Sequence, residues 1–323
     1  MQAIVYHGKE DFRYERTSDP KLEGESDSII RVSRTAICGS DLHLYHGGIP
    51  DGIGASGGFA VGHEFLGVIE EVGRGVRGFK KGDRVLASCT VGCGDCALCR
   101  RGVYSGCLTM TKGGGAGNVF GFSPSLPGGQ AEAVRVPFSD TNLFRVPAQL
   151  SDEQALFLTD ILPTGYQAVF NAEVGRGSVI AIFGAGPVGL MAAACARMLG
   201  VERIFMVDHH RYRLDFAQKT YGVEPIDFDK VDDPAAAIIE NTDYVMFTGS
   251  TAVARLIQTQ LAVRLSPQGQ PIPLIAETGG QNAMIVDSSA LAEQVVADVI
   301  ASAFDSAGQR CSALRLLCLQ EDI

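Results

Sequence analysis

Residues 178–189 read Ser-Val-Ile-Ala-Ile-Phe-Gly-Ala-Gly-Pro-Val-Gly, and this stretch decides the fold of the second half of the chain. The apolar run predicts a buried strand, and the residues after it have the composition of a helix. Gly184, Gly186 and Gly189 therefore fall in a strand-to-helix turn. Glycines at this spacing permit a tight turn, and the helix N-terminus attracts a dinucleotide pyrophosphate. An ordinary strand-to-helix turn is the alternative.

Strands and helices alternate on both sides of this motif. A helix is predicted from Ser151, which has the character of an N-cap, and the segments 202–208 and 224–228 predict strands separated by a helix at 212–222. This rhythm is typical of an α/β fold with a doubly wound parallel sheet. Asp208 ends the second strand, where a carboxylate would hold a ribose 2′-hydroxyl, so the sequence favours NAD over NADP. The adjacent residues 209–211, His-His-Arg, leave NADP open.

The first 150 residues predict a β-rich region. Short apolar runs alternate with Gly-rich turns, and six of them predict strands: 1–8, 28–37, 65–73, 83–88, 131–137 and 142–147. A small barrel or sandwich with long loops follows from this pattern. Residues 112–129, which are rich in glycine, are expected to form a flexible surface loop.

Four cysteines in this region have the spacing of a metal site. Cys93, Cys96, Cys99 and Cys107 are separated by two, two and seven residues. Four thiolates can close a tetrahedral zinc site, which then has no open position for chemistry and serves to hold a lobe together. Unpaired core cysteines or a disulfide are the alternatives, but nothing else in the sequence indicates a secreted protein.

Bulk properties restrict the class of function. The chain has 323 residues, enough for about two domains, and a net charge of −10. That charge argues against a nucleic-acid or anionic-membrane surface and leaves small-molecule substrates open. The N-terminus lacks the apolar core of a signal peptide, and no apolar run approaches the roughly 20 residues of a membrane span. With nine cysteines and a predicted metal cluster, we expect a cytoplasmic protein.

A second group of candidate metal ligands is scattered along the chain. Cys38 lies in CGSDLH, His63 and Glu64 in GHE, and Asp160 in LTDILPTGYQA. A thiolate, an imidazole and a carboxylate would give zinc three protein ligands and one open position, as a catalytic site requires. Each residue alone has a simpler explanation, such as a packed histidine, a buried thiol or a solvated carboxylate.

These motifs together resemble the zinc-dependent medium-chain alcohol dehydrogenases over about residues 1–240. The resemblance implies a GroES-like β-rich catalytic domain at 1–150 and a Rossmann-type NAD-binding half at 151–242. It implies two zinc ions per chain, with Cys38, His63 and Asp160 as catalytic-zinc ligands and Glu64 as a carboxylate that exchanges onto the metal. Ser40 would contact the substrate hydroxyl, and His43 would help pass its proton to solvent. The implied cofactor-binding residues are Thr164, Gly184, Gly186, Pro187, Val188, Gly189 and Asp208.

Residues 243–323 resemble a different family. This segment contains motifs similar to those of aldehyde dehydrogenases, namely FTGST, AETGG and GQRCS. The strongest resemblance is to the pyrroline-carboxylate dehydrogenase half of proline-utilisation proteins. In that family Cys311 would be the nucleophile and Glu277 the general base. Gly249 and Ser250 would lie beside the cofactor. Residues 243–251 and 271–279 are nevertheless expected to be the fourth and fifth strands of the sheet, the first of them after a helix at 232–242, while residues 281–323 have no evident place in it.

The leading hypothesis is hydride transfer from an alcohol or polyol to NAD by a zinc-dependent oxidoreductase with an atypical C-terminal third. Aldehyde oxidation through Cys311 is the second, and a zinc- and NAD-binding chimera with little activity is the third. The sequence leaves the substrate and a homo-oligomeric state open.

Overall fold

The computed structural model describes most of the chain up to residue 231 and short segments beyond it. The described residues are 1–47, 57–111, 117–231, 244–248, 255, 257–259, 261–263, 265, 269–271, 274–277, 282–286, 296 and 314–319. The chain divides into two compact units, the first comprising Met1–Asp160 and the second beginning at Ile161.

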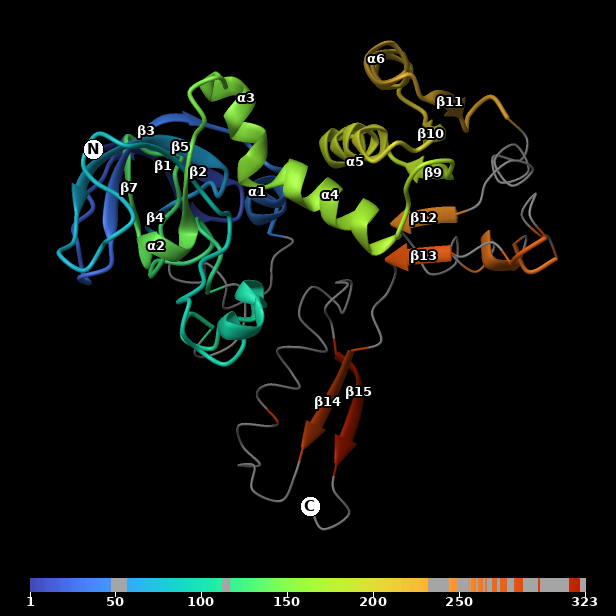
Figure 1. Cartoon of the computed structure of the whole chain (residues 1–323). Coiled ribbons are helices and arrows are strands. Elements are labelled where there is room, and N and C mark those ends of the chain that lie inside the picture. The colour runs from blue at the N-terminus through green and yellow to red at the C-terminus, as the bar shows by residue number, and fades with distance from the viewer. Residues whose placement is uncertain are drawn as a thin grey trace. The chain divides into compact units, whose positions relative to one another are not determined.

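The first unit is built on two antiparallel sheets. One has the strand order β7-β3-β5-β6-β8 and the other the order β2-β1-β4 (Figure 1). Its strands are β1 (Gln2–Gly8), β2 (Asp11–Arg16), β3 (Ser28–Thr35), β4 (Phe59–Ala60), β5 (Phe65–Val72), β6 (Arg84–Ala87), β7 (Ala133–Val136) and β8 (Leu143–Arg145). Buried Ile30, Phe65 and Ile69 fill the core of the larger sheet. All six strands predicted from the sequence are confirmed, and β2 is an additional hairpin partner of β1.

Short helices connect these strands. They are α1 (Gly39–Tyr45), α2 (Ser139–Asn142), α3 (Asp152–Leu156) and the 3-10 turns η1 (Cys99–Arg101), η2 (Tyr104–Gly106) and η3 (Phe157–Thr159). The predicted helix start at Ser151 is confirmed by a capping box. Gln154 N donates to Ser151 Oγ at 3.2 Å, and Ser151 N donates to Gln154 Oε1 at 3.0 Å.

The prediction of a surface loop at 112–129 is wrong for its described part, residues 117–129. Phe120 and Leu126 are fully buried there. The glycines serve close packing: a Cβ on Gly129 would lie 2.3 Å from the Phe65 ring. Glycine-rich composition therefore reflects close packing here as well as turns.

The second unit contains a five-stranded parallel sheet with the order β11-β10-β9-β12-β13 (Figure 1). Its strands are β9 (Val179–Phe183), β10 (Arg203–Asp208), β11 (Glu224–Asp227), β12 (Tyr244–Thr248) and β13 (Leu274–Glu277), and its helices include α4 (Ile161–Asn171), α5 (Pro187–Met198) and α6 (Arg211–Tyr221). Numbered in chain order, the strands lie in the order 3-2-1-4-5, which is the order of the first five strands of the six-stranded dinucleotide-binding sheet. The predicted α/β fold is confirmed.

The C-terminal segment contributes to this sheet as predicted. β12 pairs with β9, and β13 pairs with β12, both in parallel. β14 (Asn282–Val286) and β15 (Leu314–Leu319) form a separate two-stranded parallel sheet, in agreement with the expectation that residues 281–323 lie outside the main sheet. The helix predicted at 232–242 lies outside the described residues.

The sheet order places β9 between β10 and β12, so the chain reverses direction of winding at β9. In open parallel sheets, ligands bind beyond the carboxyl ends of the strands at such a switch point. The glycine motif directly follows β9 and therefore occupies this position. In the part of the chain that the structure describes, no helix is long and apolar enough to cross a bilayer.

Candidate functional site

Four metal-binding side chains converge in the first unit. Cys38, His63, Glu64 and Asp160 each offer a ligand atom, and these atoms all lie within 4.8 Å of one another. His63 and Glu64 are each 3% exposed, whereas Cys38 and Asp160 are half-buried, so the group is closed to water on one side and accessible on the other. The three scattered motifs that supplied the prediction are thus brought together by the fold.

The surrounding elements position these side chains. Cys38 immediately precedes α1, His63 and Glu64 lie between β4 and β5, and Asp160 follows the turn η3. Gly62, before His63, has φ +93°, a backbone conformation that favours glycine. A Cβ there would also lie 2.4 Å from the Gln130 side chain, so glycine lets this strand end pack closely.

Asp41 is a residue of this site that the sequence analysis quoted but did not recognise. It is 1% exposed, and its Oδ1 lies 3.2 Å from His63 Nδ1. Its Oδ2 accepts hydrogen bonds from Cys38 N at 2.9 Å and from Gln130 Nε2 at 3.0 Å. A carboxylate behind a ligating histidine fixes the orientation of the ring and its tautomer. Its place in the first turn of α1, three residues after Cys38, was the available signal.

The electrostatics of the group indicate a place for a cation. Burial alone would lower the pKa of His63, but hydrogen bonds with Asp160, Asp41 and Cys38 raise it to about 12. Burial, followed by the charge of Asp160, raises the pKa of Glu64. Acidic side chains therefore surround the His63 ring and stabilise a positive charge at this position. His63 Nδ1 and Asp41 Oδ1 are buried without a well-aligned hydrogen-bond partner. A thiol, an imidazole and two carboxylates are a donor set that fits zinc.

Cys89 is a second residue beside this group that the sequence analysis missed. Burial raises the pKa of its thiol to about 12, and the charge of Asp160 adds to that effect. Cys89 is not one of the four side chains whose ligand atoms lie within 4.8 Å of one another. No spacing pattern singled it out, because its proximity to Asp160 arises only in the folded chain.

The two residues predicted to handle the substrate proton lie on α1. Ser40 and His43 are both exposed and follow Cys38 within five residues. Neither belongs to the group of four side chains described above.

The four cysteines predicted to bind a structural metal are also brought together. Ligand atoms of Cys93, Cys96, Cys99 and Cys107 lie within 4.8 Å of one another. Backbone N–H groups donate to these sulfurs, among them Cys96 N to Cys93 Sγ at 3.3 Å and Cys93 N to Cys107 Sγ at 3.2 Å. The N–H of Cys99 is the main cause that lowers the pKa of Cys96 to about 6. All seven cysteines whose side chains are described are free thiols, so the disulfide alternative is not supported for this cluster.

The glycine motif of the second unit has the geometry that a dinucleotide loop requires. Gly184 has φ +100°, which allows the tight turn after β9. A Cβ on Gly189 would lie 1.9 Å from the Gly184 carbonyl oxygen, whereas one on Gly186 would meet no atom within 4 Å. Gly189 therefore permits close packing of the helix α5 against the turn, and Gly186 borders open space at the N-terminus of α5. Pro187 and Val188 form the first turn of that helix. The loop thus fits a pyrophosphate.

Asp208 lies beside this loop at the end of β10. Its Oδ2 accepts a hydrogen bond from Ala185 N at 2.7 Å, which ties the carboxylate to the glycine motif. Burial raises its pKa, but hydrogen bonds from the backbone of residues 210, 185 and 209 outweigh that effect and lower it. Asp208 therefore stays ionised at neutral pH. Thr164 lies on α4, which packs against α5.

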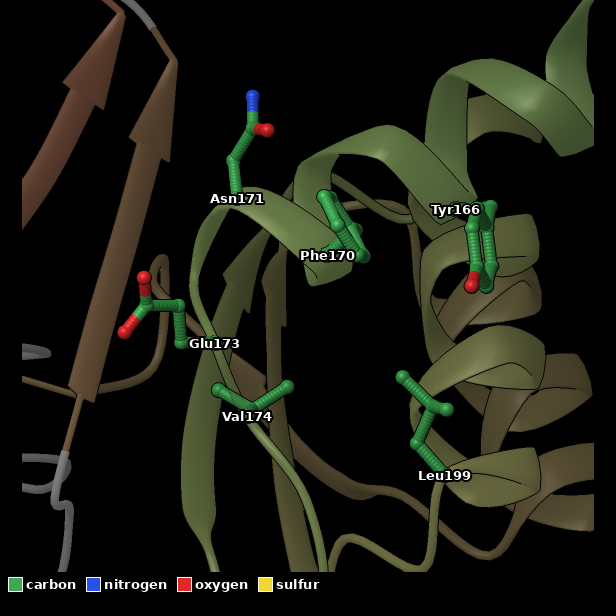
Figure 2. A pocket seen from close by; sticks show the side chains of 6 residues that line it. All are labelled: Tyr166, Phe170, Asn171, Glu173, Val174 and Leu199. Carbon is green, nitrogen blue, oxygen red and sulfur yellow. The ribbon is translucent and has the colours of Figure 1, made fainter.

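A cavity of about 550 Å³ lies elsewhere in the second unit (Figure 2). It is lined by Tyr166, Phe170, Asn171, Glu173, Val174 and Leu199. Its walls come from α4, the segment after it and the C-terminal end of α5. None of these residues belongs to the groups of metal-binding side chains or to the glycine motif.

The residues predicted for aldehyde chemistry are only partly described. Gly249, Ser250 and Cys311 lie outside the described residues. Glu277 ends the strand β13, and its side chain is not described.

Comparisons with known proteins support two separate relationships. Residues 24–148 match the model of the alcohol dehydrogenase GroES-like domain, and residues 232–323 match that of the aldehyde dehydrogenase family. The chain is also similar to the bifunctional protein PutA of Rhizobium meliloti, with 80% identity over 89 residues. These residues make up 27% of this chain and 7% of PutA.

The larger relationship covers most of the chain. The uncharacterized zinc-type alcohol dehydrogenase-like protein AdhB of Bacillus subtilis (strain 168) is 40% identical over 234 residues, 71% of this chain and 61% of that protein. The structure of the alcohol dehydrogenase TADH from Thermus sp. ATN1 is 34% identical, with a TM-score of 0.74 over 99% of this chain and 84% of that one. The chain therefore belongs to the zinc-type medium-chain alcohol dehydrogenase family and carries a C-terminal segment that matches the aldehyde dehydrogenases.

Proposed function

We propose that this protein is a zinc-dependent oxidoreductase that transfers a hydride from an alcohol or polyol to NAD. The observation that carries the proposal is the convergence of Cys38, His63, Glu64 and Asp160, two of them buried and two half-buried, in a group with the donor atoms that zinc prefers. When bound, zinc would supply a Lewis acid for the substrate oxygen, and NAD would supply the hydride acceptor.

The chain's own residues would then have distinct tasks. Cys38, His63 and Asp160 would hold the metal, and Glu64 would provide a carboxylate able to exchange with the substrate at the fourth position. Asp41 would hold the His63 ring through its Oδ1, 3.2 Å from His63 Nδ1. Exposed Ser40 would contact the substrate hydroxyl, and exposed His43 would help pass the proton of that hydroxyl to solvent.

The glycine motif and Asp208 would hold the dinucleotide. The open space beside Gly186 and the N-terminus of α5 suit a pyrophosphate. The ionised carboxylate of Asp208 suits a ribose diol and would repel a 2′-phosphate, which favours NAD over NADP. A second zinc ion, bound by Cys93, Cys96, Cys99 and Cys107, would have a structural role.

The proposal is tested by metal analysis and an NAD-coupled screen of alcohols and polyols on the purified intact chain. We expect two zinc ions per chain and NAD reduction with at least one alcohol. Cys311→Ala serves as the control. Because Cys311 has no role in the proposed reaction, the variant should reduce NAD with alcohols as fast as the unmodified chain. Turnover that survives loss of zinc but disappears in Cys311→Ala would contradict the proposal.

Two glycine substitutions separate cofactor binding from packing. Gly186→Ala should leave thermal stability unchanged, because its Cβ meets no atom within 4 Å, and should weaken NADH binding about tenfold, or about 1.4 kcal/mol, by filling the pyrophosphate space. Gly189→Ala should instead lower the free energy of unfolding by about 1–3 kcal/mol, because its Cβ would lie 1.9 Å from the Gly184 carbonyl oxygen. Calorimetric melts and NADH fluorescence titrations measure both effects. Equal NADH affinity in Gly186→Ala and the unmodified chain would contradict the assignment.

Asp41→Asn tests the positioning of His63. The amide keeps the size of the side chain but removes the charge opposite His63 Nδ1. We expect zinc affinity at the catalytic site to fall about 10- to 100-fold, while the four-cysteine site keeps its zinc. Competition with a chelator of known affinity measures this. Glu70→Gln, an exposed carboxylate on β5, is the matched control and should have no effect.

A further inference from the structure

Asp208, His209 and His210 form a third group of metal-binding side chains, separate from the two described above. A carboxylate oxygen of Asp208 and a nitrogen of each histidine ring lie within 4.8 Å of one another. The three residues span the end of β10 and the N-cap of α6. We propose that this group is a binding site for a divalent transition-metal ion of borderline softness, such as Ni²⁺ or Zn²⁺, and that the bound ion competes with the dinucleotide. The competition rests on the proposed function, but the metal site does not.

Ring contacts hold the two histidines next to each other. The ring of His209 stacks on that of Phe228 at 5.1 Å and 11°. The ring of His210 lies 4.1 Å from that of His209 at a tilt of 44°. These ring contacts do not use the ring nitrogens. Neutral imidazole is the preferred side-chain ligand of nickel, copper and zinc.

The carboxylate of Asp229 adds negative charge beside this group. Asp229 Oδ2 lies 3.7 Å from His209 Nδ1, which is longer than a hydrogen bond, and both side chains are exposed. A negative charge at this distance favours a cation bound by His209.

The hydrogen bonds of Asp208 explain why a metal ion and a ribose would exclude each other. Oδ1 already accepts from His209 N at 2.7 Å and His210 N at 2.8 Å, and Oδ2 accepts from Ala185 N at 2.7 Å. An ionised carboxylate has about four acceptor positions, so one remains, on Oδ2. A metal ion bound there would occupy the position that the ribose hydroxyl needs.

The metal site is tested by calorimetric titration of NiCl₂ into the intact, zinc-loaded protein at fixed pH, with metal analysis to verify that the zinc content is unchanged. We expect one nickel equivalent that is absent from the His209→Ala/His210→Ala variant and is bound more weakly by Asp229→Asn, which removes a nearby negative charge. His7→Ala, which removes a histidine of β1 paired with Glu15, is the control and should bind nickel like the unmodified chain. Equal nickel binding by the double variant and the unmodified chain would overturn the site.

The competition is tested by NADH fluorescence titrations with and without nickel. We expect nickel to weaken NADH binding to the unmodified chain and to have no effect on the double variant. Undiminished NADH affinity in nickel-saturated protein would overturn the competition. If NADH fails to bind in the absence of nickel, the cofactor part of the proposed function fails, whereas the calorimetry still decides the metal site.

Discussion

Replacing His63 by Ala is expected to reduce the zinc content from two ions per chain to one and to abolish alcohol-dependent NAD reduction. The imidazole is the neutral ligand of the proposed catalytic site, and it is buried against Asp41 and Asp160 with Nε2 3.3 Å from Asp160 Oδ2. Without it the remaining ligands are all acidic. A metal Lewis acid contributes several kcal/mol to such a reaction, so a loss of about 4 kcal/mol corresponds to roughly a 10³-fold fall in kcat/KM.

This experiment requires that the variant be folded and keep its structural zinc. Metal analysis and thermal melts on the same samples provide that check. His7→Ala is the matched control, because it removes a histidine paired with Glu15 and far in sequence from the proposed ligands. Alcohol oxidation that persists in His63→Ala at the level of this control would contradict the proposed chemistry.

Cys107→Ala should have the largest effect on stability. Cys107 is fully buried, and its Sγ accepts a hydrogen bond from Cys93 N within the four-thiol cluster. Loss of one ligand should release the structural zinc, whose binding free energy is part of the folding free energy. If about 4 kcal/mol is lost, the melting temperature falls by roughly 8–16 °C, on the scale of domains of 150–250 residues.

Cys195→Ala provides the matched comparison. Cys195 is a buried free thiol of α5 that belongs to none of the groups of metal-binding side chains. Cys195→Ala removes the same sulfur atom as Cys107→Ala. A small fall in melting temperature for Cys195→Ala and a large fall for Cys107→Ala would therefore assign the difference in stability to the metal. Equal melting temperatures and equal zinc content in the two variants would argue against a structural zinc.

Much of the fold could be predicted because its signals are local. Apolar runs identified the strands, Ser151 marked a helix start, and the spacing of Cys93, Cys96, Cys99 and Cys107 lies within one loop. The sheet extension through β12 and β13 was also predictable, since both segments keep the strand–helix–strand pattern. These features depend on residues near one another in the chain.

The remaining features depend on contacts between distant residues. Asp41 is an ordinary helix-start residue until the fold brings His63 and Gln130 against it. Cys89 approaches Asp160 only in the folded chain. Residues 117–129 were assigned to the surface because glycine indicates turns, although here glycine also permits packing against Phe65. Local composition does not distinguish these two uses of the same residue.

The central claim is that one zinc ion lies among Cys38, His63 and Asp160, with Glu64 beside it. Anomalous diffraction from crystals of the protein, recorded on both sides of the zinc absorption edge, tests it most directly. We expect two zinc peaks per chain, one among these side chains and one among Cys93, Cys96, Cys99 and Cys107. A single peak at the four cysteines in zinc-saturated crystals would contradict the account.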